Sequence, residues 1–103
     1  MPTKITLIID NPGDVAAFEA QYPPLLEQAR ALPGLQRVES GKVWPKEDGT
    51  PTPAHRTLDL YFDSYEDACA AVATPEGQAA IKDAVQIGTG GVRFLLSNIE
   101  YSN

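Results

Sequence analysis

The sequence predicts one α+β domain spanning residues 1–103, with its elements in the order β-α-β-β-α-β. Two periodicities carry this prediction. Ile5, Leu7 and Ile9 alternate with Lys4, Thr6 and Ile8, and Leu58, Leu60 and Phe62 alternate with Thr57, Asp59 and Tyr61; a period of two is typical of a strand. Between these runs, apolar side chains recur every three or four residues, the period of a helix that packs one face on a core. A chain of 103 residues is long enough for one hydrophobic core and too short for two.

The first helix is expected directly after the first strand. Asn11 is a candidate N-cap, Pro12 suits the first turn, and Asp14 favours the positive end of a helix. Apolar residues then follow at helical spacing, namely Val15, Phe18, Tyr22, Leu25, Leu26, Ala29 and Leu32. Proline removes an amide donor and clashes with the preceding turn, so Pro23-Pro24 predicts a kink, or two short helices, near Tyr22.

The remaining elements are bounded by turn and cap residues. Pro33-Gly34 ends the first helix, and residues 35–43 follow as the second strand. Residues 44–53 contain three prolines and an Asp-Gly turn, which predicts a polar, mobile loop. Ser64 caps the next helix, and Thr74-Pro75 begins a further helical segment. The last strand is expected over residues 92–101.

This order of elements matches the split-βαβ motif, a ferredoxin-like sandwich in which helices cover one face of a four-stranded antiparallel sheet. The other face would then expose Ile8, Tyr61 and one of Phe94 and Leu95. Contiguous exposed apolar surface usually marks an interface or a ligand groove, so we expect a homodimer packed sheet to sheet. The alternative is a monomer whose second sheet face is simply hydrated.

Charge and composition exclude several classes of partner. The chain has 8 basic and 14 acidic residues, a net charge of −6, so we expect neither nucleic acid nor an anionic membrane as partner. Cys69 is the only cysteine, which excludes an internal disulfide and predicts a buried, inert thiol in a reducing cytoplasm. No apolar run is long enough to span a membrane, and the first residues do not form a signal peptide.

Several segments, taken together and in order, carry a resemblance to a known family. They are residues 14–22, Leu32-Pro33-Gly34-Leu35, Leu60-Tyr61-Phe62-Asp63-Ser64, Thr74-Pro75-Glu76-Gly77-Gln78 and Thr89-Gly90-Gly91-Val92. The chain resembles the EthD family, named for ethyl tert-butyl ether degradation, within the dimeric α/β-barrel group. The resemblance covers nearly the whole chain.

The resemblance implies sheet-to-sheet dimers with a small-molecule pocket in the barrel interior, and relatives that accompany degradation of xenobiotics. Similar barrels include cofactor-free oxygenases, isomerases and decarboxylases, so the fold alone does not choose an activity. Family members often carry histidine at the position of Gln21 and another near Pro24 or Leu25. This chain lacks both, which places in doubt any activity that relies on those imidazoles.

His55 and Asp59 are the candidate catalytic residues. Strand alternation predicts both on the face opposite Leu58, Leu60 and Phe62, about 13 Å apart along the strand at ~3.3 Å per residue. In one interpretation either group is a proton acceptor inside an apolar cavity. In the other, His55 is solvated at the loop end and Asp59 only bonds to a neighbour.

The candidate ligand pocket comprises Ile8, Trp44, Thr57, Tyr61 and Tyr22. Tyr61 is suited to orient a carbonyl or phenol. Trp44 is either a lid at the root of the loop or a packing anchor, and Tyr22 either reaches the cavity or belongs to the core. The glycine-rich residues 88–91 precede a strand and lack the Gly-Lys-Ser/Thr ending of a phosphate loop. One histidine and one cysteine predict no metal site, and no cofactor is expected.

These inferences leave two functions open. The first is a protein that binds a small hydrophobic molecule in an apolar pocket between sheet and helices, as a cofactor-independent catabolic or accessory enzyme. The second is a non-catalytic homodimeric binding or carrier protein. The sequence does not identify the substrate.

Overall fold

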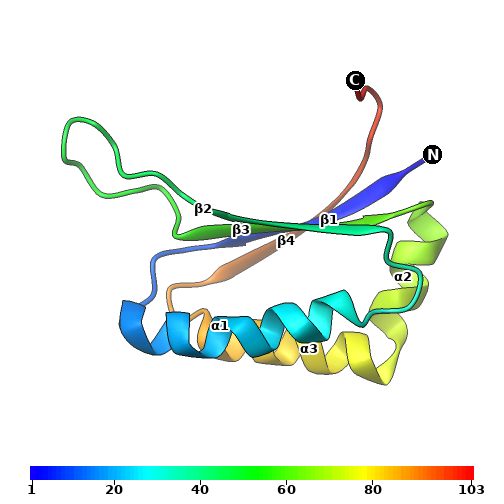
Figure 1. Ribbon diagram of the computed structural model, residues 1–103, viewed down its shortest axis with the longest axis horizontal. Coiled ribbons are helices and arrows are strands. Elements are labelled where there is room, and N and C mark those ends of the chain that lie inside the picture. The colour runs from blue at the N-terminus through cyan, green and yellow to red at the C-terminus, as the bar shows by residue number, and fades with distance from the viewer.

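The structure, a computed structural model, describes residues 1–103 and confirms the predicted order of elements. They are β1 (Thr3–Ile9), α1 (Val15–Arg30), β2 (Arg37–Lys42), β3 (Arg56–Phe62), α2 (Tyr65–Ala73), α3 (Pro75–Ile87) and β4 (Val92–Asn98). All three helices lie on one side of the sheet (Figure 1). None of them has the length and apolar character needed to cross a membrane.

The sheet has the strand order β2-β3-β1-β4, and each neighbouring pair is antiparallel. In this register Leu7 lies between Leu58 and Phe94, and Ile5 lies between Leu60 and Leu96. Side chains on paired residues point to the same face, and successive residues alternate. These apolar residues therefore form one face, and the residues between them form the other.

The core lies between the apolar sheet face and the helices. From the strands it takes Ile5, Leu7, Ile9, Leu58, Leu60 and Phe62, and from α1 it takes Phe18, Tyr22, Leu25 and Ala29. The short helix α2 adds the small side chains Ala68 and Ala71. Its predicted cap is confirmed, because the Ser64 side chain accepts a hydrogen bond from the Asp67 backbone N–H at 3.1 Å.

The prediction for the start of the first helix was wrong by several residues. Asp14, not Asn11, is the N-cap of α1, and it accepts a hydrogen bond from the Ala17 N–H at 3.0 Å. The Asn11 amide instead donates to the Thr52 carbonyl oxygen at 2.8 Å. Asn11 thus ties the β2–β3 loop to the end of β1, because that loop comes close enough to compete for its side chain.

The predicted division of the first helix is also wrong. Although Pro23 and Pro24 lie inside it, α1 continues to Arg30 as one helix. Tyr22, Leu25 and Ala29 are buried on the same face of α1, on both sides of the prolines. The free energy gained by burying this continuous apolar stripe outweighs the free energy lost because the two prolines have no amide hydrogen to donate.

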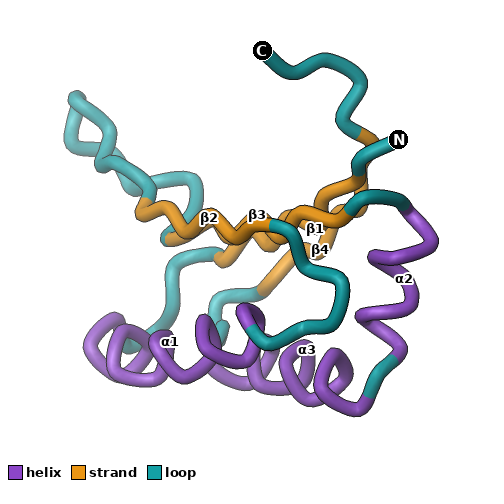
Figure 2. Tube along the Cα trace, turned by 45° about the vertical axis from the view of Figure 1, so that its right-hand side comes forward, coloured by secondary structure: helices purple, strands orange, loops and turns teal.

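The loop between β2 and β3, residues 43–55, projects beyond the edge of the sheet as an extended arm (Figure 2). At its base the Val43 N–H donates to the His55 carbonyl oxygen at 3.0 Å, and the His55 N–H donates to that of Ile9 at 2.7 Å. Trp44 is 87% exposed, so it is not the packing anchor of this arm. The arm is polar, as predicted.

Candidate functional site

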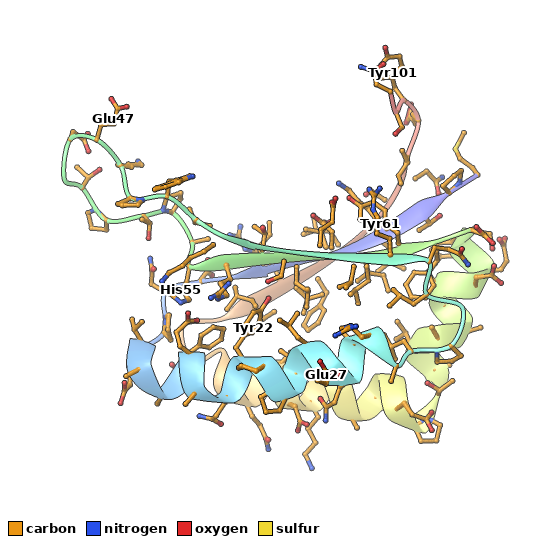
Figure 3. The ribbon with its side chains drawn as sticks, in the orientation of Figure 1. Tyr22, Glu27, Glu47, His55, Tyr61 and Tyr101 are labelled. Carbon is orange, nitrogen blue, oxygen red and sulfur yellow. The ribbon has the colours of Figure 1, made fainter.

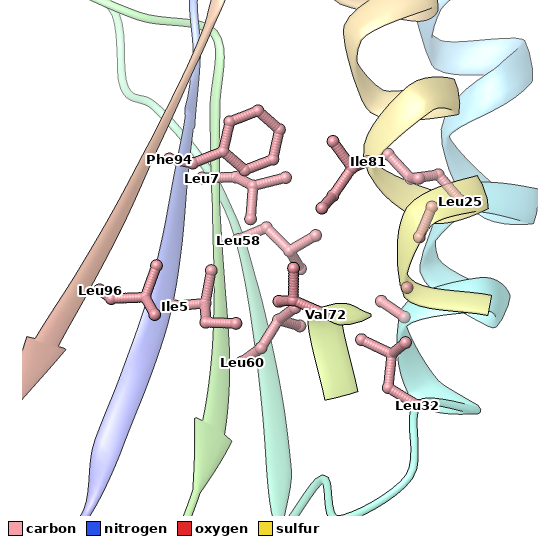
Figure 4. A pocket seen from close by; sticks show the side chains of 13 residues that line it. Ile5, Leu7, Leu25, Leu32, Leu58, Leu60, Val72, Ile81, Phe94 and Leu96 are labelled. Atoms are coloured by element: carbon pink, nitrogen blue, oxygen red, sulfur yellow. The ribbon is translucent and has the colours of Figure 1, made fainter. Parts of the chain in front are cut away.

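An apolar cavity of about 260 Å³ lies between the sheet and the helices (Figure 4). Its wall is formed by Ile5, Leu7, Leu25, Ala29, Leu32, Leu58, Leu60, Val72, Gly77, Ala80, Ile81, Phe94 and Leu96. No polar side chain is among them. The cavity is therefore suited to a molecule that needs no hydrogen bonds from its surroundings.

This cavity has two causes: successive side chains along each strand point to opposite faces of the sheet, and the helices carry small residues opposite the sheet. Leu7, Leu58 and Phe94 form one row across the sheet and point toward α3. Opposite them, Ala80 and Gly77 present little side-chain volume. At the β4 edge Phe94 and Leu96 remain 37% and 42% exposed, so this edge is the mouth of the cavity.

A second, polar cluster joins α1 to the ends of β2 and β3. The Arg56 guanidinium donates to Glu19 through Nε at 2.9 Å and Nη2 at 2.7 Å, and His55 Nε2 lies 3.2 Å from Oε2 of the same carboxylate. Lys42 Nζ lies 3.9 Å from Glu19. The hydrogen bond from Arg56 is the main cause that lowers the pKa of Glu19 to about 2.

Tyr22 lies beside this cluster. Of the two positions that the sequence left open for it, the cavity and the core, it occupies the core. It is 3% exposed, and its ring stacks on Phe18 with the ring centres 5.4 Å apart. The Arg56 guanidinium carbon lies 4.6 Å from the centre of the Tyr22 ring, a cation–π contact. The Tyr22 hydroxyl shares a hydrogen bond of 2.8 Å with Ser40 Oγ, and burial raises the pKa of Tyr22.

His55 is not on the predicted face of the sheet. It faces α1, where its ring meets Phe18 edge to face at 5.2 Å, and it is only 8% exposed. The alternation argument fails here because β3 begins at Arg56, so His55 belongs to the arm and does not follow the pleat. Its low exposure also excludes the solvated position considered for it.

Asp59, Thr57, Tyr61 and Ile8 do lie on the sheet face away from the helices, which we term the open face. Asp59 accepts a hydrogen bond from Thr6 and lies 4.0 Å from Lys4 Nζ. The Tyr61 hydroxyl donates to Glu39 at 2.6 Å. Figure 3 shows Tyr61 on the open face and Tyr22 between the sheet and α1. The structure therefore does not bring His55 and Asp59 together, because they lie on opposite faces.

None of the five residues predicted for the ligand pocket lines the apolar cavity. Ile8, Thr57 and Tyr61 lie on the open face, Trp44 lies on the arm, and Tyr22 is core. The lining residues that sequence reasoning missed are the helix-facing strand residues themselves, together with Ala80 and Gly77. The sequence did contain one signal for these residues, because large apolar side chains on the strands face small ones on the helices. That signal alone does not show where a cavity remains between the two layers.

Fold and cavity together define the class: a ferredoxin-like α+β protein with an apolar chamber between its sheet and its helices. No family model matches the chain. A curated relative, the uncharacterized 11.0 kDa protein in the thcB–thcC intergenic region of Rhodococcus erythropolis, is 36% identical over 101 residues, 94% of each chain. The chain belongs to the same family as this Rhodococcus protein.

Solved structures confirm the fold. An ethyl tert-butyl ether degradation (EthD) family protein from Bacillus halodurans C-125 is similar with a TM-score of 0.88 and 23% identity, over 96% of this chain and 99% of that one. A dimeric ferredoxin-like protein of unknown function from Thermobifida fusca has a TM-score of 0.72 at 14% identity, over 96% and 92%. The resemblance to EthD proteins is thus confirmed in the fold.

A more distant neighbour carries a named activity. A mutant of SnoaB, a cofactor-independent oxygenase from Streptomyces nogalater, is similar with a TM-score of 0.66 and 13% identity, over 98% of this chain and 94% of that one. At this identity the likeness concerns the fold. Its chemistry does not transfer to this chain by itself.

Proposed function

We propose that this protein is an EthD-type homodimer that binds a small hydrophobic organic molecule in the apolar cavity. The observation that carries the proposal is the cavity of about 260 Å³ with an entirely apolar wall. An engineered apolar cavity of roughly 150 Å³ binds benzene, so this one has room for a molecule of about two rings. The ligand class is a neutral compound without strong hydrogen-bonding groups.

The open face supports the homodimer. Three of the eight basic residues lie on it (Lys4, Arg37 and Arg93) but only two of the fourteen acidic ones (Glu39 and Asp59). Elsewhere the chain is strongly acidic, so two copies repel each other least through this face. The uncharged residues Ile8, Thr57 and Leu95 on the same face add apolar area.

A binding role is supported better than catalysis within the cavity, because no acid, base or nucleophile lines its wall. Catalysis of the kind named for SnoaB would have to rely on the substrate's own reactivity or on groups outside the wall. His55 and Asp59 remain predictions for that role. The Bacillus halodurans neighbour is described as an ethyl tert-butyl ether degradation family protein, and this description supports an accessory role in degradation of organic compounds. The single cysteine supports a reducing compartment such as the cytoplasm.

A matched pair of variants on α3 tests the proposal. Ala80 lines the cavity and the neighbouring Ala79 is exposed and does not. Naphthalene serves as the probe, and thermal unfolding is followed with and without it. We expect naphthalene to raise the midpoint for the wild type and for Ala79→Phe but not for Ala80→Phe, whose ring fills the cavity. Equal stabilisation of both variants contradicts the proposal.

Product analysis in the same samples separates the two functions. After incubation in air, unchanged naphthalene or unchanged indole, as a second probe, supports a carrier. Turnover that His55→Ala or Asp59→Asn abolishes, with thermal unfolding still cooperative, supports an enzyme and those residues.

A further inference from the structure

The arm that connects β2 to β3, residues 43–55, leaves the sheet toward the open face, whereas all three helices lie on the opposite side (Figure 1 and Figure 2). Asn11 holds it in this direction, because its amide donates to the Thr52 carbonyl oxygen at 2.8 Å and its Oδ1 accepts from the Thr52 hydroxyl at 3.0 Å. The arm carries Trp44, the one tryptophan of the chain, which is 87% exposed. A tryptophan ring displayed in this way is typical of a contact with a partner.

The residues of the open face indicate which part of a second copy the arm meets. The strand registers place these residues in three rows that run across the sheet from β2 to β4. The first row is Arg37, Tyr61, Lys4 and Ser97, the middle row is Glu39, Asp59, Thr6 and Leu95, and the third row is Gly41, Thr57, Ile8 and Arg93. Both acidic residues stand in the middle row, and the three basic residues stand in the outer rows.

Two directions are open to the two-fold axis of a homodimer packed through this face. In aligned sheet packing the axis runs either across the strands or along them. An axis across the strands reverses the rows, so that Glu39 faces the partner's Glu39 and Asp59 faces the partner's Asp59. An axis along the strands keeps the rows and reverses the strand order, so that Glu39 faces the partner's Leu95 and Asp59 faces the partner's Thr6. The second arrangement avoids both contacts between like charges and is therefore favoured.

With the axis along the strands, β2 of one copy lies over β4 of the other, and Gly41 faces the partner's Arg93. Gly41 has no side chain, which leaves room there for the guanidinium. Trp44 follows three residues later, a gap of about 10 Å in extended chain that the long Arg93 side chain spans. The Arg93 side chain is 62% exposed, and its ion pair with Asp10 at 3.3 Å uses the edge of the guanidinium. The flat faces of the guanidinium remain open for stacking on a tryptophan ring.

Contact with Arg93 brings the ring to the mouth of the partner's cavity. Phe94, the next residue of β4, lines that cavity and is 37% exposed at its mouth. We propose that the arm of each copy reaches the partner, where Trp44 stacks on the partner's Arg93 and covers the mouth of the partner's apolar cavity. This inference rests on the homodimer and the ligand cavity proposed above. Each ligand site is then completed by a residue of the other copy.

Trp44 is the only tryptophan, so tryptophan fluorescence and its quenching by acrylamide report on this residue alone. Thr57→Arg, which adds a charge to the open face, supplies the separated copies. We expect the wild-type dimer to emit at shorter wavelength than Thr57→Arg and to be quenched several-fold less. Dilution of the wild type should raise the quenching as the mass measured by light scattering falls.

Two outcomes overturn the proposal in different ways. A dimer whose Trp44 is quenched as readily as in Thr57→Arg overturns the contact while the homodimer stands. A wild type that is monomeric at every concentration removes the homodimer and this contact together.

Arg93→Ala tests the stacking partner. The ion pair of Arg93 is exposed, so its loss should cost little stability. We expect this variant to make Trp44 several-fold more accessible to acrylamide at a concentration where light scattering still shows a dimer. Arg30→Ala removes an exposed arginine from α1 and should leave Trp44 protected. Equal protection in the two variants overturns the pairing of Trp44 with Arg93.

Trp44→Ala tests the cover at the mouth. Trp44 does not line the cavity of its own chain, so a loss of naphthalene affinity in this variant arises from the partner copy. We expect dimeric Trp44→Ala to bind naphthalene several-fold more weakly than the wild type, and Tyr65→Ala, which removes an exposed ring from α2, to bind it unchanged. Unchanged affinity in Trp44→Ala overturns the cover. A wild type that does not bind naphthalene but still protects Trp44 contradicts the ligand proposal and supports the contact between copies.

Discussion

Arg56 and Glu19, 37 residues apart in the chain, form a two-pronged ion pair that joins β3 to α1, with hydrogen bonds of 2.9 and 2.7 Å. The side chains are 18% and 28% exposed, so water screens this pair less than the surface pairs. His55 and Lys42 approach the same carboxylate. The Glu19 carboxylate is therefore the common partner of three basic side chains at this end of the molecule.

Glu19→Gln should lower the free energy of unfolding at pH 7 by about 1–2 kcal/mol, because Arg56 loses its charged partner. The folded pKa of about 2 lies below the ordinary value of 4.5, so Glu19 stabilises the fold fully above pH 4.5. This contribution is lost as the pH falls toward 2. Denaturant unfolding of both proteins across this range should show their difference shrinking.

Glu27→Gln is the control for this series. Glu27 pairs with Arg30 at 3.1 Å, but the two side chains are 72% and 63% exposed, so stability should change little at any pH. A difference between wild type and Glu19→Gln that stays constant from pH 7 to 2 would contradict the assigned role of Glu19.

Tyr22→Phe should cost about 1 kcal/mol of stability, because the hydroxyl loses its bond to Ser40 while the ring keeps its contacts with Phe18 and Arg56. Ser40→Ala should cost a similar amount, and the double variant should cost less than the two losses combined. Chemical denaturation measures all three. Tyr101→Phe, at an 83% exposed position, should be neutral. Fully additive losses would show that the bond contributes nothing.

Gly77→Ala should destabilise the protein by about 2 kcal/mol or more, although alanine favours a helix over glycine. An added Cβ would lie 2.7 Å from the Val72 carbonyl oxygen and closer still to that of Ala71, so α2 and α3 would have to separate. Gly13→Ala is the control, since its nearest neighbour is Thr89 Oγ1 at 3.8 Å. Thermal unfolding compares the two, and equal midpoints would refute this steric argument.

Thr57→Arg should dissociate the proposed homodimer, because it places a long charged side chain on the open face, where Thr57 lies between Ile8 and Gly41. Light scattering over a dilution series should give twice the mass of the chain for the wild type and the mass of one chain for the variant. Ala79→Arg adds the same charge to an exposed position on α3 and should remain dimeric. A monomeric wild type at all concentrations would exclude the homodimer.

The elements were predictable because their signals are local. Alternation of Leu58, Leu60 and Phe62 with polar residues specifies a strand and its buried face, and the cap at Ser64 marks the start of α2. The errors arose where a neighbour distant in sequence decided the outcome. Asn11 bonds to Thr52 across 41 positions and so cannot cap the helix beside it. Packing of Tyr22 and Leu25 on the sheet keeps α1 whole through its two prolines.

The candidate site was less predictable than the fold. Asp59, Thr57 and Tyr61 share one face of the sheet, as alternation requires, but His55 lies just outside β3 and turns toward α1. The apolar cavity combines residues from three strands and three helices, and its volume depends on how closely α3 approaches β4. Periodicity tells which side chains point inward, but it carries no information about the distance between layers.

By itself, then, the sequence determined the kinds of elements, their order, and the acidic character of the chain, because backbone periodicity, caps and charge are properties of neighbouring residues. The tertiary structure decided that Glu19 meets His55 and Arg56, that Trp44 is exposed, and that space remains beside Phe94. These relationships depend on strand register and on the placement of helices against the sheet. Both are set by the packing of residues far apart in the chain.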